Sequence, residues 1–213
     1  MTNHRTIKDA LYEQVARIAK AAASPKRLEL IELLCQGPKS VDQLAQEAGI
    51  DIKLASAHLK ALKAARLVEA ERHGKYIVYR LASPDVARFW VSTRELAEQR
   101  LTELQQALHQ LSAAGHEWVG NSREELLAKA RDGDVVVIDV RPGAEYEAGH
   151  LPYARSLPLS ELQSRLGELP RDKPVIAYCR GPFCFMAGDA VTLLRGQGYD
   201  AVQLREGVAE WRA

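Results

Sequence analysis

The spacing of apolar and polar residues divides the chain into a mostly helical first half and an alternating second half. In the first half a short β pattern is followed by a long helix that begins at Ser83–Pro84 and ends near Leu111. At a rise of 1.5 Å per residue this helix would be about 40 Å long. We therefore expect part of its apolar stripe to face another chain. Earlier helices are predicted over 6–22, 25–36, 40–48 and 52–66.

Beyond residue 115 the pattern changes to short strands that alternate with helices. Two β-branched runs, Val135–Val140 and Pro174–Tyr178, are each followed by a loop and a helical stretch. This alternation predicts an α/β fold with a parallel sheet and helices on both of its faces. Because Ser112–Gly115 resembles a linker, we predict a multidomain chain with one domain over 1–112 and another over 117–213.

Composition and charge refine this division. The chain has 213 residues and a formal net charge of +1, which by itself argues against a nucleic-acid binder. Counted separately, residues 1–112 carry +4 and residues 113–213 carry −3, so the helical half is the basic one. With apolar runs far shorter than a membrane span and an N-terminus unlike a signal peptide, we expect a cytoplasmic protein whose three cysteines are reduced.

The segment Ser40–Val68 has the pattern of two helices separated by a tight turn at Gly49. The second helix turns one set of residues inward, namely Leu54, Ala55, Leu59 and Leu62. Its outward set is polar and cationic, which suits reading of the DNA major groove, and consists of Lys53, Ser56, Lys60 and Lys63. Each lysine taken singly also fits a solvated helix face, and His58 fits either the DNA-facing side or the edge of the core.

A basic hairpin follows, with strands over Leu67–Arg72 and Lys75–Leu81 and a tip at His73–Gly74. Arg72, His73 and Lys75 lie at or beside the tip, where they could contact backbone phosphates. A basic hairpin next to two such helices has the form of a wing.

The residues AGIDIKLASAHLKALKAARLVEAERHGKYIVYRL, Ala48–Leu81, resemble the core of ArsR-like winged helix-turn-helix repressors. The resemblance extends over about residues 8–111. It implies a homodimer that binds palindromic operators in double-stranded DNA and uses its first and last helices as the dimer interface. The DNA-binding residues would then be Lys53, Ser56, His58, Lys60, Lys63, Arg72, His73 and Lys75.

The chain departs from the metal-sensing members of that family. Those members carry a C-V-C motif before the recognition helix, and here the corresponding residues are Ser40, Val41 and Asp42. The missing thiolate ligands argue against a soft-metal site, and His109 and His116 are too sparse for a carboxylate–histidine site. We therefore expect no bound metal, and we expect no cofactor. Cys35 has two interpretations, a redox thiol as in persulfide-sensing relatives or a buried small apolar residue, and we favour burial.

In the second half Cys179 directly follows an apolar strand and precedes the helical stretch Met186–Gln197. A strand–loop–helix joint surrounds the first loop residue with backbone N–H groups, which lowers the pKa of a thiol. Because Arg180 adds a positive charge, we predict that Cys179 is largely a thiolate and acts as a nucleophile.

Further candidate residues follow the earlier β run. Asp139 and Arg141 come at its end, and Glu145 follows within the same loop. An ion pair between Arg141 and Glu145 would shape the loop, and a direct catalytic role fits the pattern as well. His150 fits a general base or a buried histidine bonded to the backbone in a fixed turn, and we favour the second interpretation.

The ordered set D-V-R, E-A-G-H-L-P-Y-A, Y-C-R-G and E-G-V-A-E-W resembles a rhodanese over about residues 117–213. The resemblance implies sulfurtransferase chemistry in which Cys179 takes a sulfane sulfur as a persulfide and passes it to a thiol. Two loop residues differ from the common form: Pro182 removes an N–H donor, and Cys184 replaces a basic residue. Cys184 fits either a resolving thiol for Cys179 or a buried packing residue.

Together these features predict a repressor whose rhodanese domain senses or handles reactive sulfur. The first alternative is an enzyme, a sulfurtransferase that uses the winged helix for dimerisation or targeting. The second and less favoured alternative is a metal- or arsenical-responsive repressor.

Overall fold

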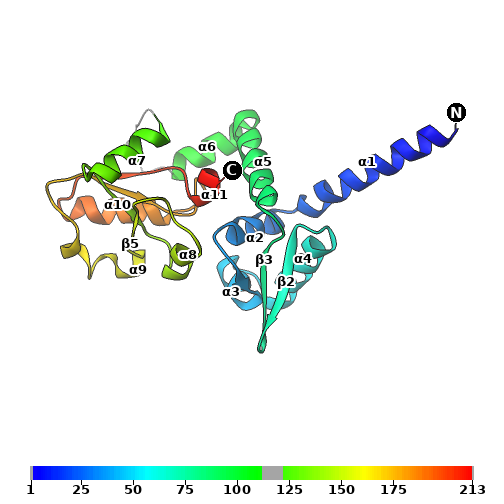
Figure 1. The fold of residues 1–213 in the computed structure, drawn as a ribbon, viewed down its shortest axis with the longest axis horizontal. Coiled ribbons are helices and arrows are strands. Elements are labelled where there is room, and N and C mark those ends of the chain that lie inside the picture. Colours follow the sequence, from blue (N-terminus) through cyan, green and yellow to red (C-terminus); the bar gives the residue numbers. More distant parts are fainter. Residues whose placement is uncertain (1, 112–121, 213) are drawn as a thin grey trace. The chain divides into compact units, whose positions relative to one another are not determined.

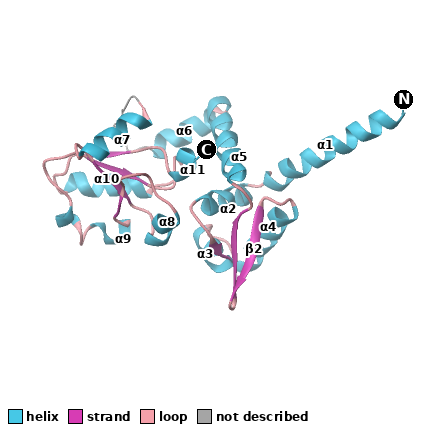
Figure 2. Cartoon of the chain, viewed as in Figure 1, coloured by secondary structure: helices cyan, strands magenta, loops and turns pink. Residues whose placement is uncertain are grey.

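The computed structural model describes residues 2–111 and 122–212, and the chain divides into two compact units, one that ends at Trp90 and one that begins at Val91. Figure 1 labels the helices and strands, and Figure 2 separates them by type. The predicted boundary near residue 115 lies outside the described residues. Among the described residues, no helix combines the length and the apolar character needed to cross a membrane.

The first unit is built from four helices, a three-stranded sheet and the start of a fifth helix. Its core includes Leu30, Ile31 and Leu44, whose side chains are fully buried. The elements are α1 (Thr2–Ala22), α2 (Pro25–Cys35), β1 (Lys39–Ser40), α3 (Val41–Glu47), α4 (Ile52–Ala64), β2 (Val68–His73), β3 (Tyr76–Leu81) and α5 (Pro84–Arg100).

Local capping explains where α3 and α4 begin. The Ser40 hydroxyl accepts the Gln43 N–H at 3.2 Å, and the Gln43 side chain accepts the Ser40 N–H at 2.8 Å, which forms a capping box. The Asp51 carboxylate accepts the Leu54 N–H at 2.9 Å at the start of α4. Gly49 makes the turn between the two helices with φ +61°, a conformation that favours glycine.

The wing is an antiparallel sheet with strand order β1-β3-β2. His73 pairs with Tyr76, so the turn consists of Gly74 and Lys75 rather than the predicted His73 and Gly74. Gly74 has φ +61° and is the residue that allows this two-residue turn. The difference of one residue places Lys75 within the tip itself.

The predicted long helix is two helices, α5 and α6 (Thr102–Leu111), so the prediction of one helix of about 40 Å was wrong. The interruption falls at Leu101, where neither glycine nor proline marks it. The Gln105 side-chain amide donates to the Glu98 carbonyl at 2.7 Å. This bond takes the place of one that a continuous helix would supply from its backbone.

The described C-terminal residues form a parallel sheet with strand order β5-β4-β6-β7, wrapped by helices. β6 lies in the middle of the sheet and ends directly before Cys179. The elements are α7 (Arg123–Asp132), β4 (Val136–Asp139), α8 (Gly143–Ala148), β5 (Arg155–Ser156), α9 (Leu159–Leu162), η1 (Leu166–Glu168), β6 (Val175–Tyr178), α10 (Met186–Gly196), β7 (Ala201–Gln203) and α11 (Val208–Arg212).

Side chains of β4 alternate between two apolar clusters, one on each face of this sheet. Ile138 belongs to a cluster with residues of α9 and α10, including Leu194. Val137 belongs to the other cluster, with Leu126 of α7 and Val208 of α11. The prediction of an α/β domain with helices on both faces is therefore confirmed.

Candidate functional sites

The loop between β6 and α10, residues 179–185, brings two thiols together, and we call it the cysteine loop. Cys179 is only 2 % exposed, whereas Cys184 is partly exposed. The Cys179 thiol has a single proton, which it can donate either to the Cys184 carbonyl oxygen, with Sγ···O 3.5 Å, or to the Cys184 sulfur. The two side chains therefore form one coupled pair of titrating groups.

The lower pKa of this pair belongs to Cys184. The hydrogen bond from Cys179, together with backbone N–H groups of Arg180 and Met186 and the charge of Arg180, lowers the pKa of Cys184 to about 7. The hydrogen bond to Cys184 and burial raise the pKa of Cys179 well above its ordinary value. The raised pKa of Cys179 is opposite in direction to the lowering that we predicted, because the fold buries this thiol beside Cys184. The role of Cys179 as a nucleophile stays a prediction.

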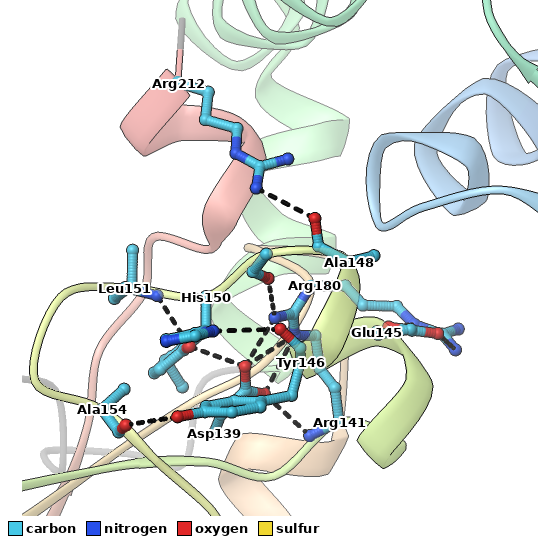
Figure 3. Close-up of polar contacts among 12 residues, drawn as sticks. Asp139, Arg141, Glu145, Tyr146, Ala148, His150, Leu151, Ala154, Arg180 and Arg212 are labelled. Carbon is cyan, nitrogen blue, oxygen red and sulfur yellow. Dashed lines mark hydrogen bonds and ion pairs between the residues drawn. The ribbon is translucent and has the colours of Figure 1, made fainter.

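The positive charge of Arg180 is largely compensated within the fold. Its Nε donates to Glu145 Oε2 at 3.0 Å, and the Glu145 side chain is buried. Arg141, which we had expected beside Glu145, donates to Asp139 Oδ1 at 2.9 Å and to the Gly149 carbonyl at 2.8 Å. Figure 3 shows this group of contacts. An anion approaching the cysteine loop therefore meets a guanidinium that already has a carboxylate partner.

Asp139 and Arg141 form a fully buried ion pair beside the end of β6, which we call the brace. The Tyr178 hydroxyl donates to Asp139 Oδ2 at 2.6 Å and accepts the Leu151 N–H at 3.1 Å. Burial, and then the charge of Asp139, raise the pKa of Tyr178, so its hydroxyl stays protonated. Because Tyr178 immediately precedes Cys179, the brace fixes the point from which the cysteine loop starts.

His150 lies on the surface of the turn after α8. Its Nδ1 is 3.0 Å from the Tyr146 carbonyl oxygen, and its ring stacks on the Tyr146 ring with centroids 3.8 Å apart. The favoured bond to the backbone is confirmed, but the expected burial was wrong. The stacking on Tyr146 explains the difference, because it holds the ring in place at an exposed position.

Gly207 and Glu210 pack against the cysteine loop. Neither of them is among the functional residues predicted from the sequence. A Cβ on Gly207 would lie 2.7 Å from the Cys179 carbonyl oxygen, so glycine permits this close approach. Glu210 is 4 % exposed, and its Oε2 accepts the Gly207 N–H at 2.7 Å. Both residues belong to the E-G-V-A-E-W run, but only the fold shows that they meet the loop.

A cavity of about 650 Å³ opens beside Cys184, within the unit that begins at Val91. Pro182 and Cys184 contribute to its wall from the cysteine loop, and Gln203 contributes from β7. Residues of α5 and α6, among them Arg94 and Glu98, form another part of the wall. Cys184 thus combines the lowered pKa with contact to a cavity large enough for a small molecule.

The predicted DNA-binding residues lie on α4 and at the wing. Most are exposed, namely Lys53, Lys60, Lys63, Arg72, His73 and Lys75, and the remaining two, Ser56 and His58, are partly exposed. Leu54 is 42 % exposed, which corrects its assignment to the inward face of α4. Cys35 is buried in α2, so the favoured interpretation of this cysteine is confirmed as to its burial.

Comparison with known proteins divides the chain in the same way. The arsR family of bacterial regulatory proteins matches residues 24–70, and the rhodanese-like domain matches residues 122–213. The HTH-type transcriptional regulator Rv0324 of Mycobacterium tuberculosis is 42% identical over 205 residues, covering 96% of this chain and 90% of that protein.

Two further similarities each concern one part of the chain. A sulfurtransferase of Allochromatium vinosum is 37% identical over 79 residues, which cover 37% of this chain and 72% of that protein. The solved structure of the homodimeric winged helix-turn-helix DNA-binding domain of Mb0332 from Mycobacterium bovis is 43% identical in sequence, with a TM-score of 0.43. The match covers 45% of this chain and 89% of the Mb0332 domain.

Proposed function

The chain belongs to the ArsR family of HTH-type transcriptional regulators and carries a C-terminal rhodanese-like domain, and we propose that it is a homodimeric repressor that responds to reactive sulfur. The observation that carries the proposal is the thiol pair of the cysteine loop. One of its members has a pKa of about 7 and lines a cavity, in the same chain as an exposed basic winged helix.

We propose that DNA is bound by α4 and the wing. Lys53, Lys60 and Lys63 would approach the major groove from α4, with Ser56 and His58 beside them. At the wing, Arg72, His73 and Lys75 would contact phosphates. The homodimer is supported by apolar side chains exposed along α1, and two copies of the winged helix fit a palindromic operator in double-stranded DNA.

We propose that sulfur enters at Cys184 and is carried by Cys179. The Cys184 thiolate attacks the outer sulfur of a persulfide donor R–S–SH, which forms a Cys184 persulfide and releases R–S⁻. The Cys179 thiol then takes the outer sulfur, and Cys184 returns to a thiol with the transferred proton. An external thiol can accept this sulfur, or Cys184 can attack Cys179 Sγ, which closes a disulfide and expels HS⁻. Asp139, Arg141 and Arg180 hold the loop for these steps.

The test is operator binding before and after treatment with polysulfide, measured by fluorescence anisotropy at a fixed salt concentration. The operator is a palindromic site that the full-length protein selects from random DNA. We expect sulfur loading to weaken binding at least tenfold and mass spectrometry to find the added sulfur on Cys179 or Cys184. Cys35→Ser is the matched control and should respond like the wild type. An undiminished response in Cys179→Ser would contradict the proposal.

The second candidate function is sulfurtransferase catalysis with Cys179 as nucleophile, supported by the rhodanese-like match and the cavity at Cys184. It predicts steady sulfur transfer together with DNA binding of only nonspecific strength. Thiosulfate is a poor candidate donor, because Pro182 offers no N–H and Arg180 is paired with Glu145. A soft-metal sensor is disfavoured, because Ser40 in the C-V-C position caps α3.

A further inference from the structure

We infer that Arg94 of α5 is a positioning residue of the cysteine site, although it lies outside the residues that match the rhodanese-like domain. The inference rests on the proposed function, because it concerns the same pair of thiols. It adds a residue of α5 on which the position of these thiols depends. Its basis is a buried ion pair between Arg94 and Glu210, residues that are 116 positions apart in the sequence.

Arg94 is almost completely buried and binds two carboxylates. Its Nη1 donates to Glu210 Oε1, and its Nε lies 3.1 Å from Glu98 Oε1 on the same helix. Glu98 also pairs with Arg205 at 2.7 Å, just beyond β7. The side chains of Arg94 and Glu210 are each only 4 % exposed. The guanidinium therefore joins α5 to α11 through a network that water hardly reaches.

The ion pair of Arg94 and Glu210 lies against the cysteine loop at two positions. A Cβ added to Gly181, which has φ +133°, would lie 3.2 Å from both carboxylate oxygens of Glu210. The Phe183 ring lies under the Arg94 guanidinium, with 6.0 Å from Cζ to the ring centroid. Gly181 and Phe183 lie between the two cysteines, so the pair supports the turn that brings Cys184 back to Cys179.

Loss of Arg94 would leave the Glu210 carboxylate buried without its counter-ion. An uncompensated negative charge beside the loop disfavours a second one on Cys184. A loosened turn also weakens the bonds from the backbone N–H groups of Arg180 and Met186 that favour the Cys184 thiolate. Both effects raise the pKa of Cys184, and neither requires the domain to unfold.

The experiment compares the pH dependence of Cys184 alkylation by iodoacetamide in full-length variants, resolved by mass spectrometry. In Arg94→Gln we expect the rate at pH 7 to fall about fivefold and the midpoint to move to higher pH. Arg94→Lys keeps the charge and should recover part of the rate. Arg88→Gln is the matched control, because Arg88 lies on the same helix and pairs with Asp85 at an exposed position.

A folded Arg94→Gln protein with the wild-type alkylation profile would overturn the inference. If Arg94→Gln does not fold, the double variant Arg94→Gln/Glu210→Gln removes both charges and leaves only the loosened turn, so the midpoint should move to higher pH by a smaller amount. An unchanged profile there would show that the pair does not position the turn. Alkylation uses neither a sulfur donor nor DNA. Failure of the wild type to take up polysulfide sulfur would therefore contradict the proposed function and leave this result intact.

Discussion

At the scale of single residues, the interaction of Cys179 with Cys184 lowers the pKa of Cys184. Cys179 occupies the strand end where loop amides gather, yet it is buried and gives its hydrogen bond to Cys184. Cys184 receives that bond and faces the cavity. The pair can therefore present one reactive thiolate near neutral pH while it keeps a second thiol within reach for transfer or bridging.

The first prediction concerns the source of this lowered pKa. The hydrogen bond from Cys179 is its largest cause, so Cys179→Ala should raise the pKa of Cys184 above about 7. A higher pKa means less thiolate at pH 7, and we expect the alkylation rate of Cys184 at that pH to fall about tenfold. Alkylation followed by mass spectrometry across the pH range measures the midpoint. Cys35→Ala should leave it unchanged, and an unchanged midpoint in Cys179→Ala would refute the assignment.

At the scale of elements, α1 presents an apolar face to solvent. Ile7, Leu11, Tyr12 and Val15 recur at helical spacing, and more than half of each side chain is exposed. A helix of 21 residues gains little stability from its backbone alone, so such a face generally needs a packing partner. In the homodimer proposed above, a second copy of the same helix would supply a matching apolar face.

The second prediction is that α1 carries the dimer interface. Charges introduced by Leu11→Glu together with Val15→Glu would have to be buried on association, at a cost of a few kcal/mol. We expect the dissociation constant of the dimer to rise at least about 100-fold, which light scattering after size exclusion would show as a monomer. Lys20→Glu lies on the opposite side of α1 and is the control. A double variant that remains a dimer would place the interface elsewhere.

Element types could be read from the sequence where the signals were local. Periodicity predicted a helix over 25–36 and the structure has one over Pro25–Cys35, because apolar spacing and the proline are local features. The break at Leu101, beside which the Gln105 side chain bonds the Glu98 carbonyl, leaves no mark in the sequence pattern. The raised pKa of Cys179 could not be predicted, because it depends on burial and on the neighbouring Cys184 in the folded loop. The ion pair between Arg180 and Glu145, 35 residues earlier, has no local signal in the sequence either. The Arg94–Glu210 pair joins still more distant residues.

At the scale of the whole molecule, a regulator that reads sulfur must link two chemistries in one chain. α5 begins directly after the wing strand β3, and it also carries Arg94, whose partner Glu210 lies beneath the cysteine loop. A change in the loop that disturbs this pair would therefore reach α5. If sulfur loading is coupled to operator binding as proposed above, the coupling is thermodynamic and has to operate in both directions.

The third prediction uses this reciprocity. If bridging of Cys179 and Cys184 weakens operator binding tenfold, saturating operator must disfavour the bridge tenfold, because DNA then binds the dithiol form more tightly. For a two-electron couple this raises the reduction potential of the pair by about 30 mV. The shift can be measured by equilibrating the full-length protein in glutathione buffers with operator or with scrambled DNA and counting alkylated thiols by mass spectrometry. Equal potentials with both DNAs would show that the cysteine loop and the DNA-binding unit act independently.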